Sequence, residues 1–259
     1  MSTIKYININ NNDVYFLACV NDKILINDNY KGMLILDSEL NMIDAIEIMD
    51  DLVIYSYYVY QNKILLYCPE NNNIVFLDVE SGKYIIISLS GFESEIFGDV
   101  YELDDDKIIL ATYKGNFICI DLLNQNPKLS YYNGTGTQVQ KDYDILKNYT
   151  VHKVFPDVTR ALVGNEELCL IDYRKHMVLL ERIKQEQYHD YELMNHCLVK
   201  IGENNINMTN CKNEVVLKPM KGYIYLRAKS LKVNEVSYII TLASCNDNAE
   251  SCMIEKHFL

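Results

Sequence analysis

The sequence predicts an all-β fold in which one four-stranded unit occurs six times. Short apolar segments alternate with turn residues, the third segment of each unit ends at a regular spacing, and the first segment of the chain belongs to no unit. The clearest pair of segments is 107–112 (KIILAT) and 116–121 (NFICID). Both are rich in β-branched and apolar residues and flank a short turn, which is typical of neighbouring antiparallel strands. Their nearly continuous apolar character indicates a sheet covered on both faces.

The same kind of segment recurs along the whole chain. The first unit comprises residues 14–20, 23–28, 32–37 and 43–48, the second 52–60, 63–68, 73–78 and 84–89, and the third 97–103, 107–112, 116–121 and 128–132. The fourth comprises 151–155, 160–165, 167–172 and 177–183, the weaker fifth 191–194, 196–201, 205–210 and 214–220, and the sixth 223–228, 237–243 and 251–259. The sixth unit therefore lacks a fourth strand.

The residues that end the third segments make the repeat countable. They are Asp37, Asp78, Asp121, Asp172, Asn210 and Lys256, and they are separated by 41, 43, 51, 38 and 46 residues. A blade of a β-propeller repeats every ~40 to 45 residues. We therefore expect each unit to be one propeller blade.

Residues 4–9 (IKYINI) precede the first unit and are the natural donor of the missing strand. With that strand in place, the chain resembles a six-bladed β-propeller of the WD40, kelch or PQQ-repeat type. The resemblance covers essentially the whole chain as a pattern, although the Gly-His and Trp-Asp dipeptides of WD40 repeats, the paired glycines of kelch and the tryptophan of PQQ repeats are absent. It implies a single β-propeller domain over residues 1–259, with four antiparallel strands per blade and residues 4–9 joining the last blade.

Composition narrows the class of partner. The chain has 259 residues, of which 49% are hydrophobic, and a formal net charge of −12. Such a charge disfavours nucleic acid and anionic membranes and favours a protein partner, in particular a basic one.

The N-terminus does not resemble a secretory signal, and no run of ~18 apolar residues is present. The eight cysteines include no CxxC pair, so we expect a reduced, cytoplasmic protein. We also expect it to be monomeric.

Two departures from the repeat are candidates for function. Residues 133–149 form the longest connection, which is either a tolerated surface loop or a loop that binds a partner. Tyrosine is enriched at interfaces, and the segment is flanked by tyrosines. The candidate partner-binding residues are Tyr131, Tyr132, Gln138, Gln140, Tyr143 and Tyr149. The second departure, residues 181–194, is expected to be a loop or a single helical turn.

No catalytic, cofactor or metal residues are assigned. The run Asp104, Asp105 and Asp106 is interpreted as a solvated turn, because a hard cation requires more converging oxygen ligands. The five histidines, His152, His176, His189, His196 and His257, show no HxH or HExxH spacing.

Three functional hypotheses follow. The first is a non-enzymatic interaction module, either an adaptor or an immunity-type inhibitor, which presents an acidic, tyrosine-bearing face to a protein. The second is a propeller enzyme with a metal or ligand in the axial channel, for which Asp99, Asp157 and Glu192 are candidates by position. The third is a small-ligand or carbohydrate sensor that uses the same channel. Polar side chains that converge from several inner strands would favour the second or third hypothesis.

Overall fold

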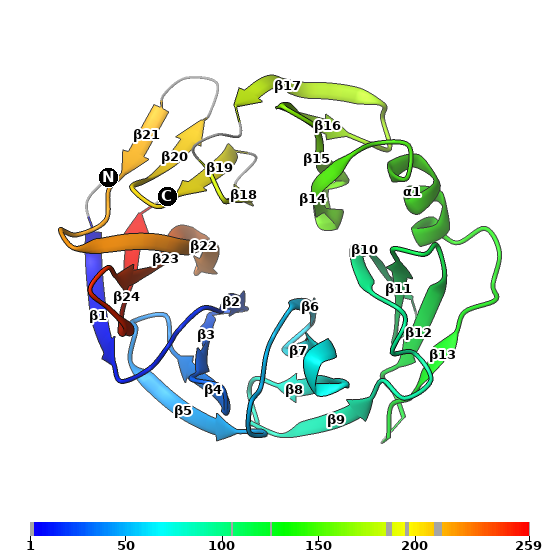
Figure 1. The fold of residues 1–259 in the computed structure, drawn as a ribbon, viewed down its shortest axis with the longest axis horizontal. Helices are drawn as coiled ribbons and strands as arrows, with labels where there is room; N and C mark the ends of the chain where they lie inside the picture. The colour runs from blue at the N-terminus through cyan, green and yellow to red at the C-terminus, as the bar shows by residue number, and fades with distance from the viewer. Residues whose placement is uncertain are drawn as a thin grey trace. The chain divides into compact units, whose positions relative to one another are not determined.

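The computed structural model of the chain describes residues 3–104, 106–124, 126–184, 188–194, 197–209 and 214–258. Within these residues the strands form six four-stranded antiparallel sheets (Figure 1). The fold class is that of a six-bladed β-propeller, as the repeat predicted. The positions Asp105, His196 and Asn210, which entered the sequence interpretation, lie outside the described residues.

The strands follow the predicted units, except that residues 14–16 and 52–55, which were expected to begin two of the inner strands, lie outside any strand. The first three sheets are β2 (Leu17–Val20), β3 (Lys23–Asp28), β4 (Gly32–Leu36) and β5 (Met42–Glu47); β6 (Ser56–Tyr60), β7 (Lys63–Cys68), β8 (Asn73–Asp78) and β9 (Tyr84–Ser88); and β10 (Phe97–Asp104), β11 (Lys107–Thr112), β12 (Phe117–Asp121) and β13 (Leu129–Tyr131). The next two are β14 (Val151–Phe155), β15 (Arg160–Gly164), β16 (Glu167–Asp172) and β17 (Met177–Lys184), then β18 (Asp190–Met194), β19 (Cys197–Gly202), β20 (Asn205–Thr209) and β21 (Glu214–Leu217).

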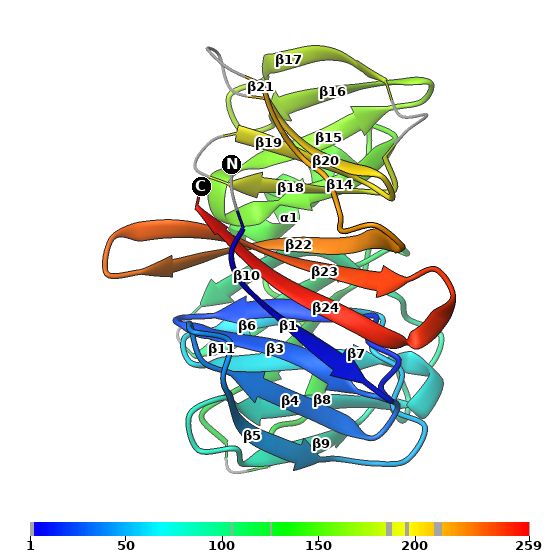
Figure 2. The same ribbon diagram turned by 90° about the vertical axis from the view of Figure 1, so that its left-hand side faces the viewer.

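The last sheet has the order β1-β24-β23-β22, so the first strand of the chain completes it. β1 (Thr3–Asn10) pairs antiparallel with β24 (Asn248–Phe258), with Tyr6 opposite Glu255 and Ile9 opposite Cys252. Figure 2 shows β1 running alongside β24. Without β1, the backbone groups along one edge of β24 would be unpaired. The predicted closure by residues 4–9 is confirmed.

The chain divides into two compact units. Unit 1 contains Met1–Asn71, Val75–Ile85 and Tyr188–Leu259, and unit 2 contains Asn72–Ile74 and Ile86–Gln187. In unit 1, apolar residues of β3, β4, β7 and β8 form one core cluster, which includes Leu25, Ile35, Leu66 and Leu77. In unit 2, residues of β10, β11, β15 and β16 form another, which includes Ile109 and Ala161. The second and third strands are thus buried on both faces, as their apolar runs predicted. The single-domain assignment stays a prediction.

The sixth sheet is longer than the sequence predicted. β22 (Tyr223–Val233) and β23 (Val236–Cys245) form one extended hairpin, where only 223–228 and 237–243 were expected. Its turn uses Asn234 and Glu235, both with positive φ (47° and 65°), which is the geometry of the tightest hairpin turns. Lys229, Ser230 and Lys232 interrupt the apolar pattern of β22. The sequence pattern therefore does not indicate that the strand continues beyond residue 228.

Residues 181–194 also differ from the expected loop. β17 continues to Lys184 and β18 begins at Asp190, so strands occupy most of this segment, while 185–187 lie outside the described residues. Among the described helices, none is long and apolar enough to cross a membrane.

Candidate functional site

The long connection between β13 and β14 contains the helix α1 (Gln138–Leu146), which the sequence interpretation did not include. A signal for it was present. Thr137 and Gln140 have the spacing of a capping box, in which the side chain at the third helical position satisfies the backbone at the N-cap. The side-chain oxygen of Gln140 accepts a hydrogen bond from the backbone N–H of Thr137 at 3.2 Å. The connection is therefore a capped helix, not a loop over its whole length.

One face of α1 is part of the core of unit 2. Val139 and Leu146 are buried and pack in the same cluster as Ile109 of β11 and Ala161 of β15. Tyr143 packs against Phe117 with ring centroids 5.7 Å apart and nearly perpendicular planes. Helical residues three and four positions apart share a face, and the buried residues of α1 follow this spacing. The helix is a structural part of unit 2.

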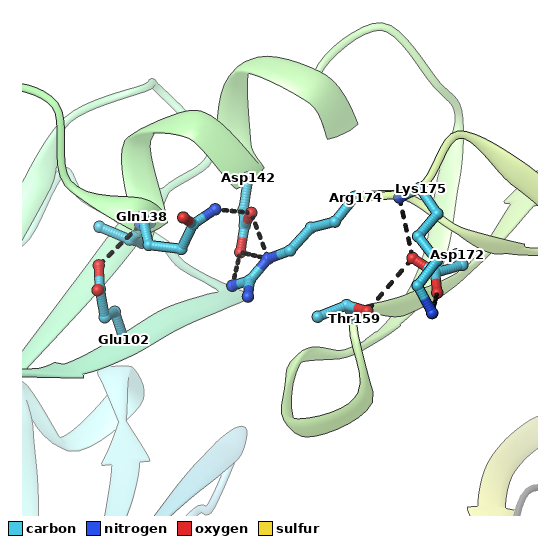
Figure 3. Close-up of polar contacts among 8 residues, drawn as sticks. Glu102, Gln138, Asp142, Thr159, Asp172, Arg174 and Lys175 are labelled. Atoms are coloured by element: carbon cyan, nitrogen blue, oxygen red, sulfur yellow. Dashed lines mark hydrogen bonds and ion pairs between the residues drawn. The ribbon is translucent and has the colours of Figure 1, made fainter.

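Charged groups hold the same helix in place (Figure 3). Asp142 is buried, and its carboxylate accepts hydrogen bonds from Arg174 Nε at 2.9 Å and from Gln138 Nε2 at 2.8 Å. The carboxylate of Glu102 on β10 accepts the backbone N–H of Val139 at 2.8 Å. A carboxylate at the N-terminal end of a helix is favourable, because the first N–H groups have no partner within the helix.

The structure separates the six candidate partner-binding residues into two groups. Gln138, Gln140 and Tyr143 lie on α1 and make the contacts described above. Tyr132 is half-buried, and a Cβ atom on Gly134 would lie 2.4 Å from its ring, so the two residues are in close contact. The exposed candidates are Tyr131 (49%) and Tyr149 (42%). That any of the six binds a partner stays a prediction.

A second group of polar side chains comes from the first strands of four sheets in unit 1. Lys229 of β22 forms an ion pair with Glu192 of β18, and its Nζ lies 5.5 Å from the ring centroid of Tyr57 on β6. The side chains of Lys229 and Glu192 are only 15% and 17% exposed. The charges of Lys229 and Glu192 both act on the Cys19 thiol of β2. We call these four residues the inner-strand cluster.

Asp99, Asp157 and Glu192 were the candidates for a metal or ligand site in the axial channel. Of these three, only Glu192 belongs to the inner-strand cluster. Asp157 lies in the 3₁₀-helix η2 (Pro156–Val158) and not on an inner strand, and Asp99 is exposed on β10 in unit 2. Among the described residues, no group of three or more histidines, cysteines or carboxylates is placed to hold a metal ion.

The environment of the inner-strand cluster keeps two of its groups protonated. Burial raises the pKa of the Cys19 thiol to about 12, although Lys229 opposes the shift. Burial alone would lower the pKa of Lys229, but Glu192 and Tyr57 outweigh it and hold the pKa of the ammonium well above its ordinary value. Nucleophilic catalysis requires the thiolate or the free amine. At neutral pH these groups therefore act as a neutral thiol and a fixed positive charge.

A third site is formed by loops of the first two sheets in unit 1. Its members are tyrosines and carboxylates at the end of β3 and on short segments that connect strands, and we call it the loop face. They are Asp13, Tyr15, Asp28, Tyr30, Asp50, Asp51, Tyr55 and Glu70. Five carboxylates thus lie in one group of loops, with Lys31 as the basic residue among these segments.

Buried amides hold the loops of this face in fixed positions. Asn27 is buried, its Oδ1 accepts the backbone N–H groups of Tyr15 and Phe16 at 2.9 Å, and its Nδ2 donates to the carbonyl of Asp13 at 2.7 Å. Asn71 has the same role in the next segment. It accepts from Val53 N at 3.0 Å and donates to the Asp51 carbonyl at 2.9 Å.

The tyrosines connect these segments to one another. The rings of Tyr15 and Tyr30 stack with centroids 5.7 Å apart, and the Tyr30 hydroxyl donates to Asp13 Oδ2 at 2.8 Å. This hydrogen bond to a carboxylate raises the pKa of Tyr30. The Tyr15 hydroxyl accepts from Ile54 N at 3.0 Å and lies 3.2 Å from the Leu52 carbonyl. Asp13, Tyr30 and the segment 50–55 therefore form one connected surface.

Much of this surface faces solvent. Tyr30 is 41% and Tyr55 63% exposed, and Asp50, Asp51 and Glu70 are exposed. Sequence interpretation did not assign any of these residues to a binding surface. The surface depends on contacts between segments about 15 to 40 residues apart, for which a single sequence offers no local signal.

Comparisons with known proteins concern the fold. No protein-family model matches the chain, and no curated protein matches it in sequence. Among solved structures, Hsv2 of Kluyveromyces lactis is similar over 92% of each chain, with 10% identity and a TM-score of 0.54. The Cps50 (Swd1) beta-propeller domain of Myceliophteria thermophila matches over 96% of this chain and 98% of its own, with 11% identity and a TM-score of 0.45. The N-terminal domain of Nup159 matches over 95% and 76%, with 11% identity and a TM-score of 0.39. With its six four-stranded sheets, the chain is thus a protein of six-bladed β-propeller architecture.

Proposed function

We propose that this protein is a non-enzymatic interaction module that binds a basic protein partner through the loop face, as an adaptor or an immunity-type inhibitor does. The observation that carries the proposal is the exposure of Tyr30 and Tyr55 among five carboxylates on loops fixed by Asn27 and Asn71. Tyrosine offers rigid, amphipathic contact area at low entropic cost, which is why it is enriched at binding surfaces.

Charge and rigidity both support this assignment. The chain carries a formal net charge of −12, which steers basic partners toward it and accelerates their association. Loops that are already ordered lose little conformational freedom when they bind. In the inner-strand cluster, Lys229 is paired with Glu192 and burial raises the pKa of the Cys19 thiol, so this cluster does not supply a nucleophile at neutral pH.

The test is capture of partners from the native host by the immobilised protein, followed by mass spectrometry. We expect a basic protein that is retained by the wild type and lost with Asp50→Asn/Asp51→Asn. The matched control is Glu166→Gln/Glu167→Gln, which removes two neighbouring exposed carboxylates from unit 2 and should retain the partner. Retention should also weaken as salt is raised.

The same experiment compares the two candidate surfaces. Tyr131→Ala/Tyr149→Ala alters the exposed tyrosines near α1 and leaves the loop face unchanged. A partner that is lost with this variant but retained by Asp50→Asn/Asp51→Asn would move the binding site to the α1 region and contradict the proposal.

We further propose that the protein is monomeric and cytoplasmic. Light scattering coupled to size-exclusion chromatography should give the mass of one chain, 30.1 kDa, and fractionation of the host should recover the protein with the cytoplasm. A stable dimer or a membrane-associated pool would contradict these two statements.

A further inference from the structure

We propose that the loop face recognises arginine in preference to lysine, so that the partner presents an arginine-bearing segment to Tyr30, Tyr55 and the carboxylates of residues 50 and 51. This inference rests on the proposed function and adds the chemical class of the group that is bound. It depends on the exposure of the two rings, on the hydrogen bond from Tyr30 to the Asp13 carboxylate, and on the backbone bond that joins Tyr30 to the segment 50–55.

The ring of Tyr30 is held in one orientation. One side of it stacks on Tyr15 with an interplanar angle of 24°, and its hydroxyl is tied to Asp13. Because 41% of the residue is still exposed, the ring offers a fixed aromatic surface beside a carboxylate. A planar cation that stacks on this surface would not have to reorder it.

Tyr55 offers a second exposed aromatic surface, on the segment that is bonded to Tyr30. Its ring meets Tyr67 edge to face, with centroids 6.0 Å apart and an interplanar angle of 88°, and its backbone N–H donates to the Tyr67 carbonyl at 2.9 Å. The Leu52 N–H donates to the Tyr30 carbonyl at 2.7 Å. The segment 50–55, which carries two exposed carboxylates as well as Tyr55, is therefore bonded to the backbone of Tyr30 through Leu52.

Aromatic rings beside carboxylates suit a guanidinium better than an ammonium. The guanidinium is planar, stacks on aromatic faces, is weakly hydrated and forms two parallel hydrogen bonds with one carboxylate. The ammonium of lysine is a strongly hydrated point charge, which is held mainly by Coulomb attraction. The chain itself contains a bidentate arginine–carboxylate pair of this kind, in which Arg174 Nε and Nη2 both donate to the Asp142 carboxylate, at 2.9 and 2.5 Å.

The experiment compares two fluorescently labelled peptides of equal length and charge, octa-arginine and octa-lysine, by anisotropy with the full-length protein. We expect the arginine peptide to bind about tenfold more tightly, a difference of about 1.4 kcal/mol. Tyr55→Leu and Tyr30→Leu should bring the two affinities together, whereas Tyr30→Phe, which keeps the ring, should preserve the preference. Asp50→Asn/Asp51→Asn should weaken both peptides. Circular dichroism melts verify that each variant is folded.

Tyr131→Leu and Glu166→Gln/Glu167→Gln are the controls, which change an exposed tyrosine and two carboxylates outside the loop face, and should bind as the wild type does. Equal affinities for both peptides, with both weakened by Asp50→Asn/Asp51→Asn, would overturn the arginine preference and leave the proposed function standing. Binding unaffected by every loop-face variant would overturn both. An arginine preference that persists in Tyr30→Leu and Tyr55→Leu would overturn the role of the rings.

Discussion

The α1 connection and the loop face form an instructive contrast. The α1 connection is the longest departure from the repeat and contains Gln138, Gln140 and Tyr143, yet the structure uses these side chains to cap, bond and pack a helix. The loop face is made of short turns within the regular repeat, yet it exposes Tyr30 and Tyr55 with several carboxylates. The length of an insertion therefore does not by itself identify a binding surface.

The physical reason lies in what the side chains of each region contact. α1 has Val139 and Leu146 on one face and gains free energy by burying them. The loop-face segments are held by Asn27 and Asn71, which bond the backbone of neighbouring segments, so Tyr30 and Tyr55 can remain exposed. Variants of the two regions should separate their effects on stability from their effects on binding.

The largest effect is expected from removal of β1, which ends at Asn10 and leads directly into the loop-face segment with Asp13 and Tyr15. Deleting residues 4–9 leaves β24 with an open edge and removes Ile7 and Ile9 from their apolar cluster. We expect the melting temperature to fall on the order of 10 °C or more, since 1 kcal/mol shifts it by about 2–4 °C at this size. Ile4→Ser, at an exposed position of the same strand, is the control. A truncated protein with an unchanged melting temperature would disprove the role of β1.

A smaller loss is expected in the core of the α1 region. Leu146→Ala removes a buried side chain and should cost about 2–5 kcal/mol of unfolding free energy, measured by urea denaturation. The folded variant should still bind octa-arginine as the wild type does. Loss of binding in a folded Leu146→Ala protein would show that the two regions are coupled.

Acid pH should act on unit 2 through Asp172. Burial alone would raise the pKa of this carboxyl, but hydrogen bonds from Lys175 and Thr159 and the charge of Lys175 lower it below the ordinary value of 3.8. A carboxyl with a lowered pKa stabilises the folded state above the unfolded pKa, and this stabilisation is lost as the pH falls through the folded pKa. Asp172→Asn should therefore reduce stability at pH 7 and flatten the decline below about pH 4. An unchanged decline in melts between pH 2 and 7 would contradict this role.

The smallest effect on stability is expected at the loop face. Asp50→Asn/Asp51→Asn replaces exposed side chains, and the unfolding free energy should change by less than about 0.5 kcal/mol, while peptide affinity falls. A large loss of stability in urea denaturation would mean that these carboxylates hold the loops together and are not displayed for binding.

Much of the architecture was predictable because it follows from local pattern. β3, β7, β8 and β11 begin and end where their apolar runs do, since a strand that is covered on both faces leaves a continuous apolar signature. The closing strand was found by counting, because one unit lacked a strand and one strand lacked a unit. α1 was predictable in principle from Thr137 and Gln140, whereas the length of the β22–β23 hairpin was obscured by its polar residues.

The amino-acid sequence alone thus determined the repeat, the number of sheets and the partner of β1, because each depends on the order of residues along the chain. Only the tertiary structure decided which polar side chains meet. Lys229 joins Glu192 from 37 positions away, and Tyr30 joins Asp13 from 17. Such contacts depend on how loops and inner strands of different sheets are packed together, and side-chain type alone does not encode that packing.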